Sequence, residues 1–194
     1  MKGVTKLLNG HAVAPLMLDA LKELLRYPDV TSVHWAQTLD SGAGDSWGLI
    51  TQDGHAKASF NAMWLFEKVL PAAANQSRVE VESGAGEAAG CVGHIASANG
   101  THAALLVWRP IDCSGQRSPK NMQLDVSVAL GSALNGKDAK GTVAEISAVS
   151  ASYLDNRSSE WLRSTPLRGV RREGMEWEGT LCDGCVLAFA FEAM

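Results

Sequence analysis

The feature that most constrains the fold is a change of apolar periodicity near residue 72. Before it, apolar residues recur at helical spacing over residues 15–27 and 56–70. After it, apolar and polar residues alternate in short runs separated by turn-forming residues, which is typical of antiparallel strands. The change predicts a helical N-terminal part, residues 1–71, followed by a β-domain, residues 72–194.

The N-terminal part is predicted to contain a helix, a strand and a second helix. The first helix covers residues 15–27 and is followed by Pro28, which cannot continue it. Residues 30–37 form a short apolar run before a Gly-rich loop, which predicts a buried strand. A tight turn is expected at Gln52-Asp53-Gly54, and the second helix after it is expected to bury Phe60, Trp64 and Val69. This order of elements is one slice of an α/β architecture.

The second part of the chain contains six runs with strand character. The clearest is residues 122–130, where Leu124, Val126 and Val128 point to one side and Asp125 points to the other. The fold class predicted is therefore α+β, with an antiparallel β-sandwich as its larger part. The predicted strands cover residues 79–82, 92–97, 102–109, 122–130, 142–149 and 186–191.

Composition and charge exclude several classes of partner. The chain has 194 residues, of which 46% are hydrophobic and 20% are charged, a balance that supports a packed core. The net charge of -4 gives no general attraction to nucleic acid or to anionic membranes. The basic cluster of Arg168, Arg171 and Arg172 is followed by acidic residues, which predicts a solvated loop. No apolar run approaches the roughly 18 to 20 residues of a membrane span, and no targeting segment is expected.

Three segments of the chain resemble parts of one enzyme family. The first is SVHWAQTLD at residues 32–40, and the second is WGLITQDGHAKASFNA at residues 47–62. The third, LDNRSSEW at residues 154–161, is loosely similar to the family's "I-D-x-x-H-S-N-x-x-x-x-W" run, with altered spacing and without the His. The family is the clan-A glycoside hydrolases, most closely the β-xylosidase and α-L-iduronidase family and the related α-L-arabinofuranosidases. The second segment looks like its "G-L-x-x-x-D-G-x-x-K-P-A-Y-x-A" passage into the last barrel helix.

The resemblance implies which part of such an enzyme this chain represents. The first segment looks like the eighth strand of a (β/α)8 barrel, so the helix-strand-helix part would be a barrel remnant in front of a jelly-roll-like sandwich. Retaining glycosidases need two carboxyl groups roughly 5 to 5.5 Å apart. In this clan they lie at the ends of the fourth and seventh strands, ahead of the first matching segment. No catalytic residue is therefore assigned.

Two aspartates near the predicted eighth strand were considered as replacements. Asp40 and Asp45 flank the Gly-rich loop, on the side where a barrel places its chemistry. Aspartates beside glycine are usually turn formers whose side chains bond to their own backbone. The chain alone is accordingly expected to be catalytically silent.

Four residues are predicted to contact carbohydrate. Trp35 resembles the aromatic on which the family stacks its sugar, and its structural alternative is a core tryptophan covering residues 15–27. Trp47 lies in a loop of small residues and is expected to be exposed. His34 and Asp40 belong to the same segment as Trp35 and complete the predicted contacts. The predicted partner is an oligosaccharide or polysaccharide.

The four cysteines, Cys91, Cys113, Cys182 and Cys185, allow several pairings. All four thiolates could hold a structural zinc ion. Disulfides such as Cys91 with Cys113 would fit a secreted enzyme. A thioredoxin-type role is disfavoured because the CxxC precedes a strand rather than opening a helix. Free buried thiols are the simplest alternative.

The histidines supply no pattern typical of a metal site. They are scattered along the sequence without HxxxH or HExxH spacing, so no metal and no cofactor is predicted. A hairpin with Asn99-Gly100 at its turn would allow His94 and His102 to face each other, but histidines without a shared role are favoured over such a pair.

The sequence favours an accessory role. The chain is predicted to be a non-catalytic C-terminal portion of a glycoside hydrolase that binds carbohydrate or supports the barrel. One alternative is a hydrolase of xylosides or arabinosides whose site is unrecognised or completed by a partner. A second is a metal-stabilised interaction module. Because a barrel slice leaves bare strand edges, a homo-oligomer or a dimer that swaps residues 30–37 is expected. The location would be extracellular or periplasmic if the chain is part of a longer secreted enzyme.

Overall fold

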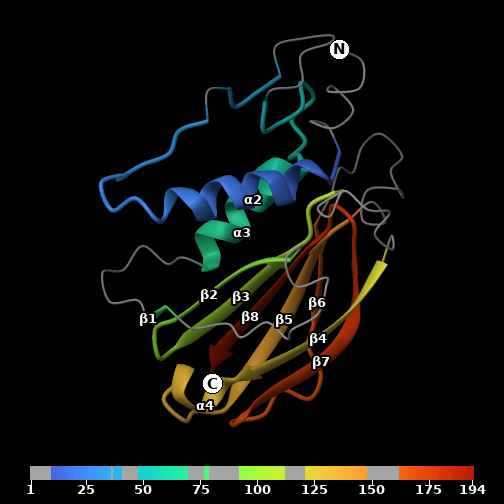
Figure 1. The fold of residues 1–194 in the computed structure, drawn as a ribbon. Helices are drawn as coiled ribbons and strands as arrows, with labels where there is room; N and C mark the ends of the chain where they lie inside the picture. Colours follow the sequence, from blue (N-terminus) through green and yellow to red (C-terminus); the bar gives the residue numbers. More distant parts are fainter. Residues whose placement is uncertain are drawn as a thin grey trace.

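A computed structural model of the chain describes residues 10–35, 37–40, 48–69, 77–78, 92–111, 121–147 and 162–194. Two helices are followed by mostly antiparallel strands, which confirms the α+β class (Figure 1). The elements are α2 (Val13–Leu24), α3 (Ala58–Val69), β1 (Ser77–Arg78), β2 (Gly93–Ala98), β3 (His102–Trp108), β4 (Asn121–Ala129), α4 (Leu130–Ala133), β5 (Ala139–Ile146), β6 (Leu162–Pro166), β7 (Gly174–Cys182) and β8 (Val186–Ala193).

The strands form a six-stranded sheet and a two-stranded ribbon. The order in the sheet is β1-β2-β3-β8-β5-β6, and β4 pairs with β7 in the ribbon. Strand β8 lies at the centre, antiparallel to both β3 and β5, so that Val186 is opposite Trp108 on one side and Ile146 on the other. The last strand of the chain thus joins two halves of the sheet that are distant in sequence.

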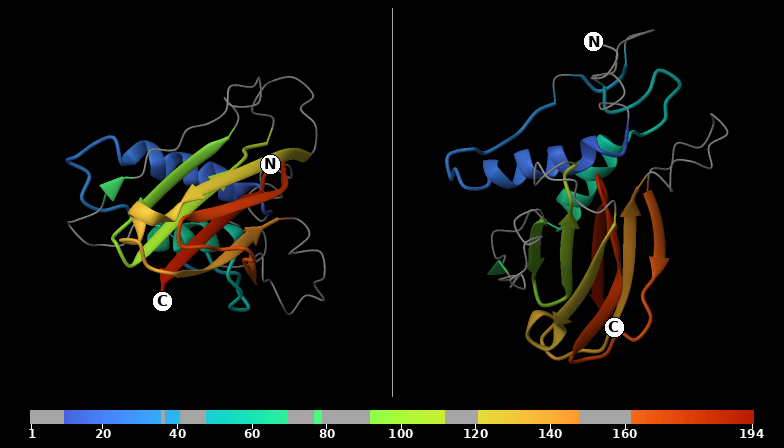
Figure 2. Two further views of the ribbon diagram at one scale, coloured as in Figure 1. Left: turned by 90° about the horizontal axis from the view of Figure 1, so that it is seen from below. Right: turned by 45° about the vertical axis from the view of Figure 1, so that its right-hand side comes forward.

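The sheet has an apolar core on each face. In β3, Leu106 and Trp108 belong to the core shared with α2 and α3, whereas Leu105 and Val107 belong to the core shared with the ribbon. The cause is the two-residue period of a strand, which sends neighbouring side chains to opposite faces. Such central strands are apolar throughout because both of their faces are covered. Figure 2 shows α2 and α3 gathered at one end of the strands, with the short α4 at the other end.

Most of the predicted strands are confirmed, and three of the described strands, including the two-residue β1, were not predicted. Residues 79–82 lie outside the described residues; the other five predicted runs correspond to β2, β3, β4, β5 and β8. Strands β6 and β7 were not predicted. In β7, Met175 and Leu181 are buried and alternate with Glu176 and Glu178, so the period of two is present in the sequence. The neighbouring arginine cluster is exposed, as predicted for a solvated loop.

The buried strand predicted at residues 30–37 is wrong. The described residues 30–35 are all exposed and belong to no strand, and Val33 is 45% exposed. An isolated parallel β-bridge does occur a few residues later, between Leu39 and Ile50. A strand buries its backbone by pairing along its length with neighbouring strands, and residues 30–35 belong to none of the described strands.

The helices were predicted to within a few residues, and Val69 is buried as predicted, but the burial predicted for Trp64 on α3 is wrong. Trp64 is 41% exposed rather than part of the core. The buried stripe consists of Ala58, Ala62, Leu65 and Val69, which follow one another at helical spacing. Trp64 is two residues from Ala62 and therefore lies on nearly the opposite side of the helix. Small residues on the buried side let α3 lie close to its neighbours.

Polar contacts fix the helices to the sheet. The indole N–H of Trp108 donates to Asp19 Oδ1 at 2.6 Å, and the Lys22 ammonium lies 5.7 Å from the centre of the same ring. The Trp108 ring lies against Gly93, where a Cβ atom would be 2.1 Å from it. The Ser97 hydroxyl donates to a backbone carbonyl at the end of α3. The helices and the sheet therefore share one core. The division of the chain into two parts at residue 71 stays a prediction.

Candidate functional site

Two of the three segments that resemble the glycosidase family meet at a buried ion pair. The Lys57 ammonium lies 2.6 Å from Asp40 Oδ2 and 2.8 Å from Asp40 Oδ1. The backbone N–H of Gly48 donates to Asp40 Oδ1 at 2.8 Å. Only 3% of the Lys57 side chain is exposed. We call Asp40, Gly48 and Lys57 the Asp40 junction.

Backbone geometry explains why glycine is required in this junction. A Cβ atom at Gly48 would lie 2.5 Å from the backbone nitrogen of Asp40. The N–H of Asp40 donates to the carbonyl of Ile50, and the N–H of Lys57 donates to the carbonyl of Leu49, both at 2.9 Å. Residues 38–40 and 48–57 are therefore held together by backbone bonds as well as by charge.

A tight turn leads from this junction into α3. The N–H of Gly54 donates to the carbonyl of Thr51 at 2.9 Å, and Gly54 has a φ of +89°, which confirms the predicted turn. The Thr51 hydroxyl donates to Asp53, and this bond, together with a backbone hydrogen bond, holds the pKa of Asp53 below its ordinary value. Asp53, Gly54 and Lys57 are the D-G-x-x-K residues of the family pattern. Sequence reasoning matched Lys57 but assigned it no role, although its place in the motif was a signal.

The four predicted carbohydrate-contacting residues are only partly brought together. Trp35 is 37% exposed, so the alternative of a core tryptophan is wrong. His34 is also exposed, with its Nε2 3.2 Å from the Ser32 hydroxyl. Asp40 is buried and both of its oxygens are bonded within the junction, away from solvent. Trp47 lies outside the described residues. Contact of these residues with sugar stays a prediction.

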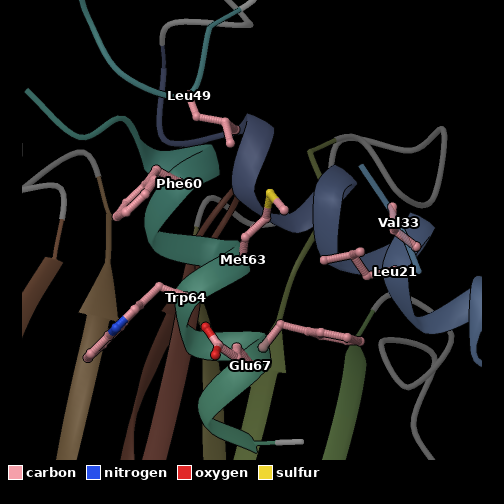
Figure 3. A pocket seen from close by; sticks show the side chains of 8 residues that line it. Leu21, Val33, Leu49, Phe60, Met63, Trp64 and Glu67 are labelled. Atoms are coloured by element: carbon pink, nitrogen blue, oxygen red, sulfur yellow. The ribbon is translucent and has the colours of Figure 1, made fainter. Parts of the chain in front are cut away.

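An open apolar groove lies beside the helices. It has a volume of about 490 Å³, and its lining includes both buried residues and the exposed ring of Trp64. Figure 3 shows Phe60, Met63 and Trp64 projecting from α3, with Leu21 on α2. Apart from one carboxylate the lining is apolar, whereas ligand sites also carry polar groups that orient the ligand. The groove is lined by Leu21, Val33, Leu49, Phe60, Met63, Trp64, Phe66 and Glu67.

Two of the four cysteines form a disulfide. Cys182 is bonded to Cys185, so free thiols at these two positions and a zinc site made of all four thiolates are both wrong predictions. A disulfide sulfur no longer carries the thiolate charge that binds zinc. Cys91 and Cys113 lie outside the described residues. Within the described ranges, no three His, Cys, Asp or Glu residues are placed to hold a metal ion.

The cross-strand pair that was considered for His94 and His102 is not formed, although its hairpin is confirmed. Strands β2 and β3 are joined at Asn99-Gly100, but the register places His94 opposite Val107 rather than opposite His102. The two histidines are therefore at different ends of the hairpin. Burial, and to a lesser extent the nearby charge of Lys22, lowers the pKa of His94 below its ordinary value.

No protein-family model and no curated protein sequence matches this chain. Solved structures do. The GH39 enzyme from Xanthomonas axonopodis pv. citri superposes with a TM-score of 0.61 at 13% identity, over 97% of this chain and 42% of its own. A monomeric β-xylosidase from Caulobacter crescentus superposes with a TM-score of 0.59 at 13% identity, over 97% and 43%. A glycoside hydrolase family 30 subfamily 8 xylanase from Clostridium acetobutylicum gives 0.53 at 12% identity, over 95% and 40%.

The chain shares its fold with part of clan-A glycoside hydrolases. It spans less than half the length of these neighbours. At such low identity the likeness concerns the fold and does not carry over an activity.

The Asp40 junction can hold segments 38–40 and 48–57 together, but the carboxylate of Asp40 is already paired with the Lys57 ammonium. Among the described helices, none has the length and apolar character to cross a membrane.

Proposed function

We propose that this chain is the non-catalytic C-terminal portion of a glycoside hydrolase, which supports the end of a (β/α)8 barrel on a jelly-roll-like β-sandwich. The observation that carries the proposal is the Asp40 junction. It lies in the segments that resemble the last barrel unit, and its charged groups are used for internal bonding. A general acid or base must reach the substrate to exchange a proton with it. Asp40 is buried and both of its oxygens are bonded, so its role is to hold the surrounding segments together rather than to exchange protons with a substrate.

The supporting role has a physical basis in the packing of the helices. Helices α2 and α3 share a core with the sheet, and the Asp40 junction fixes the segment that precedes α3. An apolar face beside the helices includes Val33 and Trp64 of the groove lining, and the exposed Trp35 follows two residues after Val33. This apolar face is the side on which the rest of a barrel would pack. The sandwich thereby acts as a rigid base for the barrel's closing unit.

We further propose that Trp35 contacts carbohydrate. An exposed indole offers the flat apolar surface on which a sugar ring stacks. The test is a titration of intrinsic fluorescence with xylan and arabinan oligosaccharides. A saturable change that is lost in Trp35→Ala and kept in Trp64→Ala is expected, because both tryptophans are exposed and only the first belongs to the predicted site. If neither sugar changes the fluorescence, the role of the chain is support alone.

The non-catalytic assignment is tested with aryl-xyloside and aryl-arabinoside substrates. The purified chain is expected to release no aryl alcohol above the rate of buffer alone. Turnover that persists after repeated purification would overturn the assignment and favour the alternative of a hydrolase with an unrecognised site.

For the isolated chain we propose self-association through the exposed apolar face. Exposed patches of this kind tend to be covered in aqueous solution. Analytical ultracentrifugation of the wild type is expected to show an oligomer that Val33→Glu converts to a monomer. Ile111→Glu is the matched control, since Ile111 is similarly exposed but lies just past the end of β3, outside the groove lining. A monomeric wild type would refute self-association without affecting the fold relationship.

A further inference from the structure

The turn between β7 and β8 carries a disulfide that neither the glycosidase resemblance nor the proposed function uses. Cys182 and Cys185 are bonded across Asp183-Gly184, and the N–H of Cys185 donates to the carbonyl of Cys182 at 3.1 Å. We propose that this disulfide is a redox-cleavable latch that holds the start of α2 on the sheet. The proposal rests on the contacts of the turn and stands whether or not the chain supports a barrel.

The turn is tied to the end of β3 through Arg109. The N–H of Gly184 donates to the carbonyl of Arg109 at 2.9 Å, and the N–H of Arg109 donates to the carbonyl of Cys185 at 3.0 Å. The Arg109 guanidinium, with 3% of its side chain exposed, lies 3.1 Å from Asp183 Oδ1. Separating a buried charge from its partner destabilises the folded chain strongly. The pairing of Arg109 with Asp183 therefore holds this turn in one position.

The same turn contacts His11 and Ala12, the two residues just before α2. The His11 ring donates from Nε2 to the carbonyl of Asp183 across 3.4 Å. Gly184 has a φ of +74°, and a Cβ atom there would lie 3.1 Å from the Cα of Ala12. Ala12, the N-cap residue of α2, makes no side-chain capping bond. The first N–H groups of α2 donate to local carbonyls, Val13 to Gly10 at 3.4 Å and Ala14 to His11 at 3.0 Å. The β7–β8 turn therefore reaches the start of the helix through His11 and Ala12, the residues that form this first turn.

The burial of the two sulfurs decides where a reductant attacks. Cys185 is 1% exposed, whereas Cys182 is half-buried. The thiolate of an external dithiol attacks Cys182 Sγ, the Sγ–Sγ bond breaks, and Cys185 leaves as a thiolate that takes up a proton. The second thiol of the reductant then resolves the mixed disulfide and releases Cys182 as a thiol. Two electrons and two protons pass to the cysteine pair, and the dithiol becomes a disulfide.

Cleavage is expected to act locally. The bond closes a very short loop, so it removes little entropy from the unfolded chain, and its main effect is on the shape of the turn. We expect reduction to lower the Tm by about 4 to 8 °C for a chain of this size. The larger change is expected in α2, where amide hydrogen exchange should rise several-fold over residues 10–24 and stay constant over Ala58–Val69.

The experiment compares the wild type with and without dithiothreitol, by thermal melting and by hydrogen exchange with mass spectrometry. C182S/C185S should show the rise in α2 exchange without reductant and no further response to it. C91S/C113S should respond like the wild type. Gly184→Ala disturbs the turn but keeps the sulfurs, and should also raise α2 exchange, so the proposal can be tested even if C182S/C185S does not fold.

Three outcomes would overturn the latch. The first is alkylation of all four cysteines without reductant, which would mean that the bond does not form. The second is a fall in Tm with no selective rise in α2 exchange, which would mean that the bond stabilises the chain without holding the helix. The third is a response to dithiothreitol that disappears in C91S/C113S.

Discussion

Strand β3 and the segment at residues 30–37 look similar in sequence but fold differently. HAALLVW in β3 and VTSVHWAQ at residues 30–37 are both short, apolar and partly β-branched. Strand β3 is paired along its length with β2 and β8 and is largely buried, whereas residues 30–35 are exposed and form no strand. The difference is the presence of neighbours. An apolar run becomes a strand when other segments satisfy its backbone and cover its side chains.

The comparison also explains where stability resides. Trp108 and Phe189 are fully buried, one in the core on each face of the sheet, while Trp35 and Val33 contribute exposed apolar surface. Burial of an apolar side chain contributes about 1.5 to 3 kcal/mol relative to its exposure. The sheet is therefore expected to determine the free energy of unfolding, and residues 30–35 to affect it little.

The largest expected effect is at the centre of the sheet. Phe189→Ala should lower the free energy of unfolding by about 3 to 5 kcal/mol, because it leaves a cavity beside Trp177, whose ring centre is 5.2 Å away. Trp35→Ala should change it by less than about 0.5 kcal/mol, as expected for an exposed residue. Urea unfolding followed by circular dichroism measures both. Equal losses would show that residues 30–35 are as well packed as β3.

The second expected effect concerns the Asp40 junction, the ordered boundary of the exposed segment. Lys57→Met should cost about 3 kcal/mol, because Asp40 would remain buried without its cation. The double variant Asp40→Asn, Lys57→Met should recover most of that loss, since Asn can still accept from Gly48 and no charge remains. The same urea titrations test this. A double variant as unstable as Lys57→Met would mean that the charge itself is not the cause.

The smallest expected effect is the pH dependence of the free energy of unfolding that arises from His94 on β2, beside Lys22 of α2. The pKa of His94 is lowered in the folded chain, so below pH about 6.5 the unfolded chain binds more protons. The contribution of His94 to the free energy of unfolding is therefore fully present above that pH and falls as the pH is lowered. His94→Gln should flatten the dependence of the Tm between pH 7 and 5. An unchanged slope in this variant would assign the loss to other groups.

Sequence patterns were sufficient for elements whose partners are local or repetitive. The helix before Pro28, the hairpin at Asn99-Gly100 and the turn at Gly54 follow from local geometry and were placed correctly. The alternation of β4 was also correct, with Val126 buried between exposed neighbours. Strand β7 was missed because its glutamates hid an equally regular alternation.

The candidate site was harder to predict because its residues gain their roles from distant contacts. Trp64 has helical spacing from Phe60, yet it faces outward because the smaller Ala58 and Ala62 face the core. Nothing local to Asp40 indicates that Lys57, 17 residues later, neutralises it. Cys182 and Cys185 likewise admitted several chemistries until their side chains were placed in one turn.

By itself, the sequence determined the two kinds of element, their order and most of their bounds, because periodicity and turn chemistry act over a few residues. The tertiary structure alone decided which apolar runs are covered. It paired β8 with β3 and β5, left residues 30–35 exposed, and enclosed the charges of the Asp40 junction. The physical reason is that burial and backbone pairing belong to neighbours in space, which a pattern within one segment does not specify.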